Sequence, residues 1–264
     1  MQYKLVATDI DGTLLNSKSE LTPHTIDTIQ RSIANGLIFA ISTGRPIQGV
    51  QFFAKLLEVD MPFITYNGAM VIMSKSQKIL YEQKLAAHDA ADAIRLGKQY
   101  GTTVLVWADN QLYVTEHNEK TEHYKTISTI EPILVPSFDD IIANGVSKVL
   151  WYDEESKIEQ YRIEVGAHIS KQVNFHPSRP IFLEFVDKDA TKAIGMQKIG
   201  EHYGIKQEEM IAIGDGFNDL SMIEYAGLGI VMANAKDVVK EKADFITKSN
   251  DEDGVAYAIE KFIL

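Results

Sequence analysis

The sequence of 264 residues contains no cysteine. It can therefore form neither a disulfide nor a thiolate metal site, and this composition suits a reducing compartment, so we expect a cytoplasmic protein. No run of about 18 apolar residues occurs, so we expect no membrane span and no signal peptide. Acidic residues outnumber basic ones, 37 to 26, which gives a formal net charge of −11. Because basic patches bind nucleic-acid phosphates, and none is visible, we expect no nucleic-acid partner.

Two common cofactor motifs are also missing. The seven histidines form no H-x-x-x-H pair, which argues against a zinc site. A Gly-x-Gly sequence begins at Gly227, but Met232 stands where a dinucleotide-binding motif has its third glycine. Residues 228–232 are therefore better interpreted as a core strand.

Two aspartates follow the apolar run at residues 4–7, a run that predicts a strand buried on both faces. Side chains two apart on a strand share a face, so Asp9 and Asp11 are expected to point the same way. Paired acids repel each other and lose solvation, a cost that a shared proton or a bound cation can meet. Hard oxygen ligands favour Mg²⁺, and such a pair suits covalent catalysis at phosphorus. A plain Asx turn with Gly12 as its permissive residue is the alternative.

A second buried strand is predicted at residues 37–41, and Ser42, Thr43, Gly44 and Arg45 follow it before a helix start at Pro46. Backbone N–H groups at a helix N-terminus and the Thr43 hydroxyl can donate to an anion. Gly44 has no Cβ to hold such a ligand away. A strand-to-helix turn capped by Thr43 explains the same residues without a ligand.

Lys192 lies in the first turn of a helix predicted to run to about residue 203. A cation there opposes the helix dipole at a cost of about 0.3–1 kcal/mol, which makes sense if an anion lies opposite. Asp189 as the helix N-cap is a local alternative partner. An exposed, solvated side chain is the commoner fate of a single lysine.

The strand predicted at residues 210–213 also ends in acids. Asp215 and Asp219 are four apart across a loop that begins a helix, so both can face one pocket mouth, where Asn218 supplies an amide. An acidic helix N-terminus that complements the helix dipole is the alternative, and it explains one carboxylate better than two.

These four segments, in this order, resemble the four motifs of the haloacid dehalogenase (HAD) superfamily of aspartate-nucleophile phosphohydrolases. Tracts at residues 65–69, 182–188 and 247–256 are similar to its Cof-type subfamily, and most of all to the bacterial sugar-phosphate phosphatases in it. The resemblance implies an α/β fold: a Rossmannoid, doubly wound parallel sheet forms the core, and an α+β cap with an antiparallel sheet and helices is inserted into it.

The resemblance also implies roles for the motif residues. Asp9 would be the nucleophile that forms an aspartyl phosphate, and Asp11 the general acid/base. Thr43 and Lys192 would hold the phosphoryl oxygens, and Lys192 would also pair with Asp9. The other residues implied in phosphate or substrate binding are Gly44, Arg45, Asn67 and Asn218.

The metal implied by the resemblance is Mg²⁺. The Asp9 carboxylate, the Asp11 backbone carbonyl and Asp215 would bind it, and Asp219 would act without touching the ion. Because the chain as a whole is acidic, a phosphate substrate must be drawn in by local cations.

Alternating strands and helices predict a catalytic core at residues 1–84 and 188–264. Between them, residues 85–187 are expected to form the inserted cap, a half-exposed antiparallel sheet with helices near residues 88–99 and 156–166 on its other face. All four motifs lie outside this insertion, so we expect it to select the substrate.

The sequence therefore predicts a Mg²⁺-dependent phosphatase for small phosphorylated metabolites, sugar phosphates first, in a monomer or weak homodimer. A phospho-accepting signalling domain would lack the cap and the acid at position 11. A haloacid dehalogenase would not need Asp11, Asp215 and Asp219 together. A catalytically weak sugar-phosphate-binding or regulatory protein on the same fold stays open.

Overall fold

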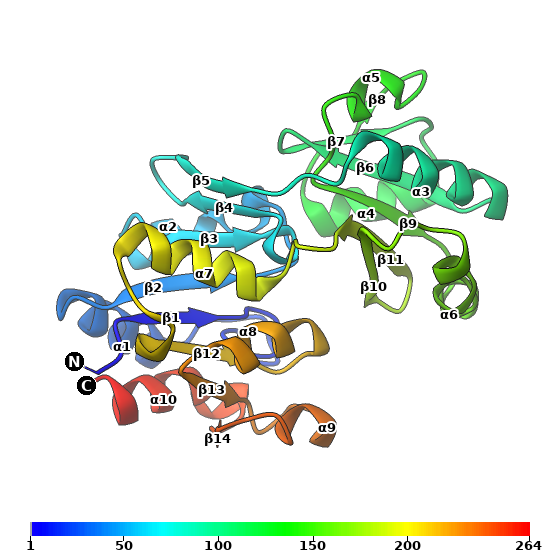
Figure 1. The fold of residues 1–264 in the computed structure, drawn as a ribbon. Helices are drawn as coiled ribbons and strands as arrows, with labels where there is room; N and C mark the ends of the chain where they lie inside the picture. The colour runs from blue at the N-terminus through cyan, green and yellow to red at the C-terminus, as the bar shows by residue number, and fades with distance from the viewer. Residues whose placement is uncertain (1) are drawn as a thin grey trace. The chain divides into compact units, whose positions relative to one another are not determined.

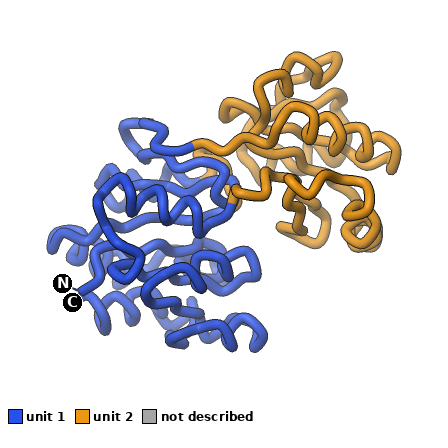
Figure 2. Tube along the Cα trace, in the orientation of Figure 1, with its two compact units in different colours: residues 1–43, 50–81, 191–264 blue, residues 44–49, 82–190 orange. Residues whose placement is uncertain are grey.

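The computed structural model describes residues 2–264 and divides them into two compact units (Figures 1 and 2). The first unit contains the chain up to Thr43, together with Val50–Tyr81 and Thr191–Leu264. The second contains Gly44–Gly49 and Glu82–Ala190. Each unit has its own sheet and its own apolar core.

An eight-stranded sheet forms the centre of the first unit, in the order β14-β13-β12-β1-β2-β3-β4-β5. Its strands are parallel from β14 to β3, and β4 runs antiparallel to β3. The carboxyl ends of β1, β2 and β12 therefore lie at one edge, where open α/β sheets bind ligands. The strands are β1 (Leu5–Thr8), β2 (Ile38–Ser42), β3 (Pro62–Thr65), β4 (Met70–Met73), β5 (Ile79–Glu82), β12 (Met210–Gly214), β13 (Leu228–Val231) and β14 (Phe245–Ile246).

Helices pack on this sheet in two groups, as a doubly wound fold requires. Apolar side chains of α7 and α8 share one buried cluster with β1 and β12, while α1 contacts both α2 and α10 (Figure 1). Thr22 caps α1 by accepting from Thr25 N at 3.1 Å. The helices are α1 (Pro23–Ala34), α2 (Gln51–Leu57), α7 (Lys192–Tyr203), α8 (Leu220–Tyr225), α9 (Asp237–Lys240) and α10 (Gly254–Phe262).

Short 3₁₀ turns precede three of these helices. They are η1 (Ile47–Gly49) before α2, η5 (Phe217–Asp219) before α8 and η6 (Asn250–Glu252) before α10. The break before α10 has a clear cause: Asp253 takes a left-handed backbone conformation, with φ of 55°. Its carboxylate then accepts from the Thr25 hydroxyl of α1 at 3.1 Å.

The second unit is built on a six-stranded sheet in the order β10-β11-β9-β6-β7-β8. Neighbouring strands are antiparallel, except that β8 runs parallel to β7. The strands are β6 (Thr103–Ala108), β7 (Gln111–Val114), β8 (Ile133–Leu134), β9 (Lys148–Tyr152), β10 (Val173–Arg179) and β11 (Phe182–Asp187). The helices are α3 (Ala87–Tyr100), α4 (Glu119–Ser128), α5 (Asp139–Ile142) and α6 (Glu155–Glu164).

Both faces of this second sheet carry helices, so the expected half-exposed sheet is wrong where α4 covers it. Helices α3, α5 and α6 share an apolar cluster with Trp151 and Phe185. On the other face, Tyr124 of α4 accepts a hydrogen bond from Trp107 Nε1 at 3.0 Å and packs edge-on against Phe182. The sequence did not reveal α4 because its surface is mostly polar and a single tyrosine provides much of its packing.

Residues 44–49 belong to the second unit, although the sequence placed them in the core. Gln48 Nε2 donates to the Asn110 carbonyl at 2.6 Å, and Lys148 Nζ lies 3.5 Å from the Gly44 carbonyl.

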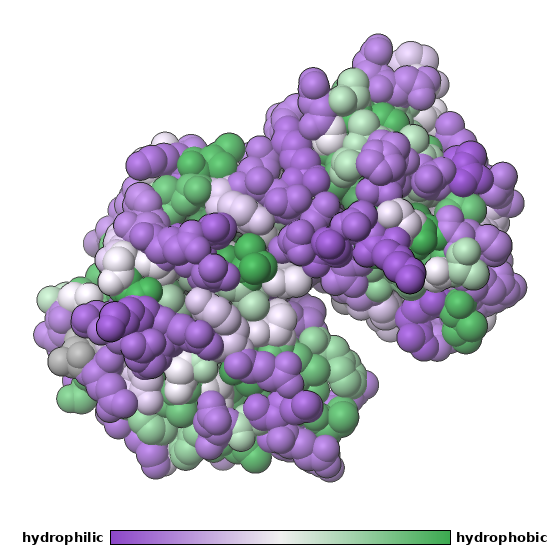
Figure 3. Space-filling model, in the orientation of Figure 1, coloured by the Kyte–Doolittle hydropathy of each residue, from purple (hydrophilic) through white to green (hydrophobic). Residues whose placement is uncertain are grey.

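Polar side chains cover most of the face shown in Figure 3, with apolar residues in small separate patches. Across residues 2–264 no helix is long and apolar enough to cross a membrane.

Candidate active site

The site lies at the carboxyl ends of β1, β2 and β12. Asp9 directly follows β1 and is buried, with 7% of its surface exposed. Asp11 lies beyond a turn and is exposed, and its backbone forms a bridge with Leu15. The expectation that Asp9 and Asp11 share a strand face is therefore wrong, because β1 ends at Thr8 and the chain turns between the two acids.

Lys192 joins the motifs through its buried ammonium group. Its Nζ donates to Asp9 Oδ1 at 2.6 Å, to Asp219 Oδ1 at 2.6 Å and to the Ser42 carbonyl at 3.0 Å. Its side chain is fully buried, so it is not the solvated surface lysine that the sequence left open. All three donor positions of the ammonium group are used, which fixes it firmly.

The backbone before Lys192 is fixed by two features. Thr191, rather than Asp189, is the N-cap of α7, since its hydroxyl accepts from Ile194 N at 3.2 Å. Asp189 instead lies in a turn, where its N–H donates to Asp187. Gly68 has a φ of 109°, and a Cβ there would lie 2.0 Å from the Thr191 carbonyl oxygen. Only glycine allows this approach.

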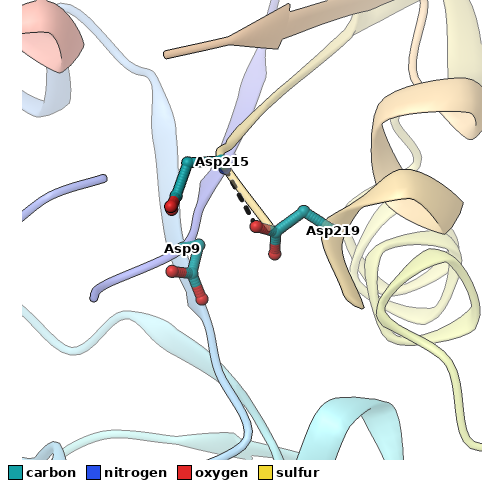
Figure 4. A group of neighbouring side chains, drawn as sticks. All are labelled: Asp9, Asp215 and Asp219. Carbon is teal, nitrogen blue, oxygen red and sulfur yellow. Dashed lines mark hydrogen bonds between the residues drawn. The ribbon is translucent and has the colours of Figure 1, made fainter. Parts of the chain in front are cut away.

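Asp219 is held by backbone groups as well as by Lys192. Its Oδ2 accepts from Asp215 N at 3.0 Å (Figure 4) and also from Gly216 N at 2.8 Å. Both of its oxygens therefore already accept hydrogen bonds. This arrangement suits a residue that shapes the loop around Asp215 and holds Lys192 in place.

Asp215 faces Asp9 and is oriented by Thr13, whose hydroxyl donates to Asp215 Oδ1 at 2.6 Å. The sequence analysis gave Thr13 no role. A hydroxyl residue directly after the turn residue Gly12 could have indicated a hydrogen bond to a neighbouring carboxylate. Gly12 has a φ of 86°, and a Cβ at this position would lie 2.5 Å from Asp215 Oδ2. The chain between Asp11 and Thr13 thus passes very close to this carboxylate.

Burial and crowding change the protonation of these groups. Burial, with the charge of Asp219 next, raises the pKa of Asp9 to about 8. Burial also raises the pKa of Asp215 to about 6. Burial lowers the pKa of Lys192, but the charges of Asp219 and Asp9 outweigh it and hold that pKa above its ordinary value. The site therefore holds more negative charge than one ammonium group stabilises well.

The remaining predicted site residues divide between the two units. Asn218 Nδ2 donates to Asn67 Oδ1 at 3.3 Å, so the structure brings these two amides together. Thr43 is buried in the first unit, and its carbonyl accepts from Asn67 N at 3.0 Å. Gly44 and Arg45 follow directly in the chain but belong to the second unit.

The carboxylates suit a hard divalent cation. One oxygen from each of Asp9, Asp215 and Asp219 lies within 4.8 Å of the others. Carboxylate oxygens are the ligands that Mg²⁺ prefers in proteins. Because Asp219 already accepts three hydrogen bonds, Asp9 and Asp215 are the side chains that best fit direct coordination.

A buried carboxylate beside a buried lysine and a second acid is a set of groups suited to phosphoryl transfer. Comparison with known proteins agrees with this chemistry. The model of the haloacid dehalogenase-like hydrolase family matches residues 6–259. The chain therefore belongs to this family, and within it to the Cof-type phosphatases. It is a hydrolase with phosphatase activity, and its family generally uses a divalent metal.

Its relatives align along nearly their whole length. YxeH of Bacillus subtilis is 33% identical, and the alignment covers 99% of each chain. YitU of the same organism, named as a 5-amino-6-(5-phospho-D-ribitylamino)uracil phosphatase, is 30% identical over 98% of this chain and 97% of its own. A haloacid dehalogenase-like hydrolase from Bacteroides thetaiotaomicron has a TM-score of 0.87 and 32% identity, covering 98% of this chain and 99% of its own. The subclass IIB sugar phosphatase BT4131 has a TM-score of 0.83 and 27% identity, covering 98% of each chain.

Proposed function

We propose that this phosphatase hydrolyses sugar phosphates with the help of Mg²⁺ and through an aspartyl phosphate on Asp9. The observation that carries the proposal is the buried Asp9 carboxylate, held by Lys192 at 2.6 Å and facing Asp215. A nucleophile needs a fixed direction of attack, and Lys192 supplies it by occupying one oxygen of Asp9. The other oxygen is then the one that attacks phosphorus.

The two half-reactions use Asp11 first as an acid and then as a base. In the first, Asp9 attacks phosphorus while Asp11 gives a proton to the leaving oxygen. In the second, Asp11 takes a proton from water as that water attacks the phosphorus of the aspartyl phosphate. The bond between phosphorus and the Asp9 oxygen breaks, which restores the Asp9 carboxylate and releases inorganic phosphate. A positioned acid or base of this kind typically contributes about 10²–10⁴ in rate. An exposed Asp11 is compatible with both steps, because it must meet the leaving group and then the attacking water.

Charge stabilisation supplies the larger share of the acceleration. We assign the Thr43 hydroxyl and the Gly44 and Arg45 backbone N–H groups to the phosphoryl oxygens. Lys192, whose three donors are used by Asp9, Asp219 and the Ser42 carbonyl, contributes through its positive charge. Mg²⁺, held by Asp9, Asp215 and the Asp11 carbonyl, would supply electrostatic stabilisation of the charge on the phosphoryl group.

The substrate class rests on the relatives. YitU is named for a phosphorylated ribityl compound and BT4131 for sugar phosphates, which points to a phosphate on a polyhydroxylated carbon chain. The second unit, which we propose as the cap, contains none of Asp9, Lys192, Asp215 and Asp219. These four residues recognise what all phosphomonoesters share. We therefore assign the choice of leaving group to the cap.

A panel of phosphorylated metabolites, assayed with and without Mg²⁺, tests this function. We expect sugar and sugar-alcohol phosphates to lead in kcat/KM, and Asp9→Asn to leave essentially no turnover. Asp27→Asn is the matched control, because Asp27 is an exposed aspartate of α1 that pairs with Arg31 at 3.5 Å. Full turnover by Asp9→Asn would exclude the mechanism. Tight binding of a sugar phosphate without turnover by the native chain would favour the regulatory alternative.

A further inference from the structure

Two asparagines tie the loop after Asp9 to later segments of the same unit. Asn234 follows the carboxyl end of β13 and Asn250 follows that of β14, and both strands are parallel to β12. Asn234 Nδ2 donates to the Gly12 carbonyl at 2.8 Å, and Asn234 Oδ1 accepts from Asn250 N at 3.0 Å. Asn250 Nδ2 donates to the Leu15 carbonyl at 2.9 Å. All of these residues belong to the first unit.

The loop needs such a tie because Asp11 and Gly12 are the two central residues of a β-turn. Thr13 N donates to the Ile10 carbonyl at 3.3 Å and closes the turn, and both end residues are buried. Asp11, by contrast, is exposed, and Gly12 has a φ of 86°. Glycine has more backbone freedom than any other residue, so the buried ends of the turn do not fix its centre by themselves. A hydrogen bond to the Gly12 carbonyl removes much of that freedom.

Asn234 is itself held in place, as a support for this turn must be. Its amide donates at one end and accepts at the other, so both of these contacts fix its rotation. The residue before it is also tied, since Ala233 N donates to the Lys248 carbonyl at 3.3 Å. The segments after β13 and β14 are thereby joined to each other, and the Asn234 side chain connects them to the turn that carries Asp11.

We propose that Asn234 is a positioning residue for Asp11: by holding the Gly12 carbonyl, it fixes where the Asp11 side chain gives its proton to the leaving oxygen. The inference rests on the proposed function, which assigns that proton transfer to Asp11. A proton donor must lie within about 2.6–3.2 Å of the atom that it protonates, and a displacement of about 1 Å can slow a reaction about 10²-fold. Asn234 acts through the backbone of Gly12 and not on the substrate.

The rival role for Asn234 is general support of the loop, which would reach Asp215 through Thr13. The two roles differ in their dependence on the leaving group. A sugar phosphate releases an alkoxide, which needs a proton as its bond to phosphorus breaks, whereas p-nitrophenyl phosphate releases a phenolate that leaves without one. Both substrates carry the same phosphoryl group. Loss of a positioned proton donor therefore slows the sugar phosphate selectively, and loss of general support slows both substrates alike.

The test compares Asn234→Ala with the native chain on p-nitrophenyl phosphate and on the sugar phosphate that has the highest kcat/KM in the panel. We expect kcat/KM on the sugar phosphate to fall about 3- to 10-fold, the size of one lost hydrogen bond, and kcat/KM on p-nitrophenyl phosphate to change by less than about twofold. The quantity kcat/KM is used because it covers only the steps up to release of the leaving group. Asn35→Ala is the matched control and should change neither value, because Asn35 is an exposed asparagine of the same unit, at the end of α1.

The ratio of the two kcat/KM values guards against misfolding, because partly unfolded protein lowers both values by the same factor. Asp11→Asn is assayed beside Asn234→Ala and should show the same selective loss on the sugar phosphate, with a larger factor. If Asp11→Asn slows both substrates alike, the proposed role of Asp11 has failed and the inference fails with it. If Asp11→Asn shows the selective loss but Asn234→Ala slows both substrates alike, or neither, the proposed function stands and the inference about Asn234 is wrong.

Discussion

Replacing Lys192 with methionine is the perturbation whose effect the structure determines best. The change removes an ammonium group that lies 2.6 Å from each of two buried carboxylates, Asp9 and Asp219. Each contact corresponds to about 6 kcal/mol of attraction at an effective dielectric constant of about 20. The carboxylates can relax or bind a proton, so the measured loss is smaller. Breaking a buried pair by removing one partner typically costs about 3–5 kcal/mol, and we expect Lys192→Met to lose that much stability without metal.

The loss should also depend on pH in a defined direction. Asp9 has a raised pKa of about 8, and Lys192 is one of the groups that lower it. Without Lys192 the pKa of Asp9 rises further, so above about pH 8 native Asp9 is ionised while Asp9 of the variant still binds its proton. In the unfolded chain Asp9 carries no proton above about pH 8. Only the variant must therefore lose a proton from folded Asp9, and only the variant loses stability as pH rises. The gap between the two proteins therefore widens above about pH 8.

Urea unfolding in excess EDTA, followed by circular dichroism, measures this gap. Tryptophan fluorescence is unsuitable, because Trp107 and Trp151 both lie in the second unit and Lys192 lies in the first. Lys198→Met is the control: Lys198 lies on the same helix, is 34% exposed and pairs with Glu201 at 2.8 Å. Exposed pairs contribute about 0–1 kcal/mol. If the two variants lost equal stability at pH 9, the buried ion-pair cluster would not have the energetic role argued here.

Three further predictions address the loops around the site. Gly12→Ala should weaken Mg²⁺ binding and activity by at least tenfold, because the new Cβ would lie 2.5 Å from Asp215 Oδ2; a titration of activity against Mg²⁺ measures it. Gly68→Ala should lower the free energy of unfolding of the first unit, measured in urea, by more than about 1 kcal/mol, because its Cβ would lie 2.0 Å from the Thr191 carbonyl oxygen. Gly36→Ala is the control: it has open space and a similar φ, so it measures the backbone strain alone. Removing Mg²⁺ with EDTA should abolish turnover, adding Mg²⁺ should restore it, and Ca²⁺ should not replace it because its looser coordination disturbs in-line geometry; turnover that persists after metal stripping would contradict the metal role.

Much of the fold could be predicted because its signals are local. Buried strands that end in acids or hydroxyls, at residues 4–7, 37–41 and 210–213, lie beside one another in the parallel sheet. Their carboxyl ends meet at one edge by the geometry of such sheets, whatever lies between them in sequence. Lys192 was harder to interpret. Its burial depends on partners 27 and 183 residues away, which no local pattern reveals.

The errors have separate causes. Asp189 has the side chain of a good N-cap, but α7 begins at Lys192, so Thr191 directly precedes the helix and caps it. Helix α4 has little apolar periodicity; a capping box of Asn118 and Thr121 sets its start, and Tyr124 packs it on the sheet. Residues 44–49 join the second unit through Gln48 and Lys148, contacts that connect residues 62 and 104 positions apart.

The stereochemical course at phosphorus tests the central claim most directly. A phosphorothioate monoester made chiral with oxygen isotopes is hydrolysed in water carrying a third isotope, and the configuration of the thiophosphate product is determined. Transfer to Asp9 and then to water is two in-line displacements, each of which inverts the configuration, so the account predicts net retention. Net inversion would mean that water attacks the substrate directly, and it would contradict the role assigned to Asp9.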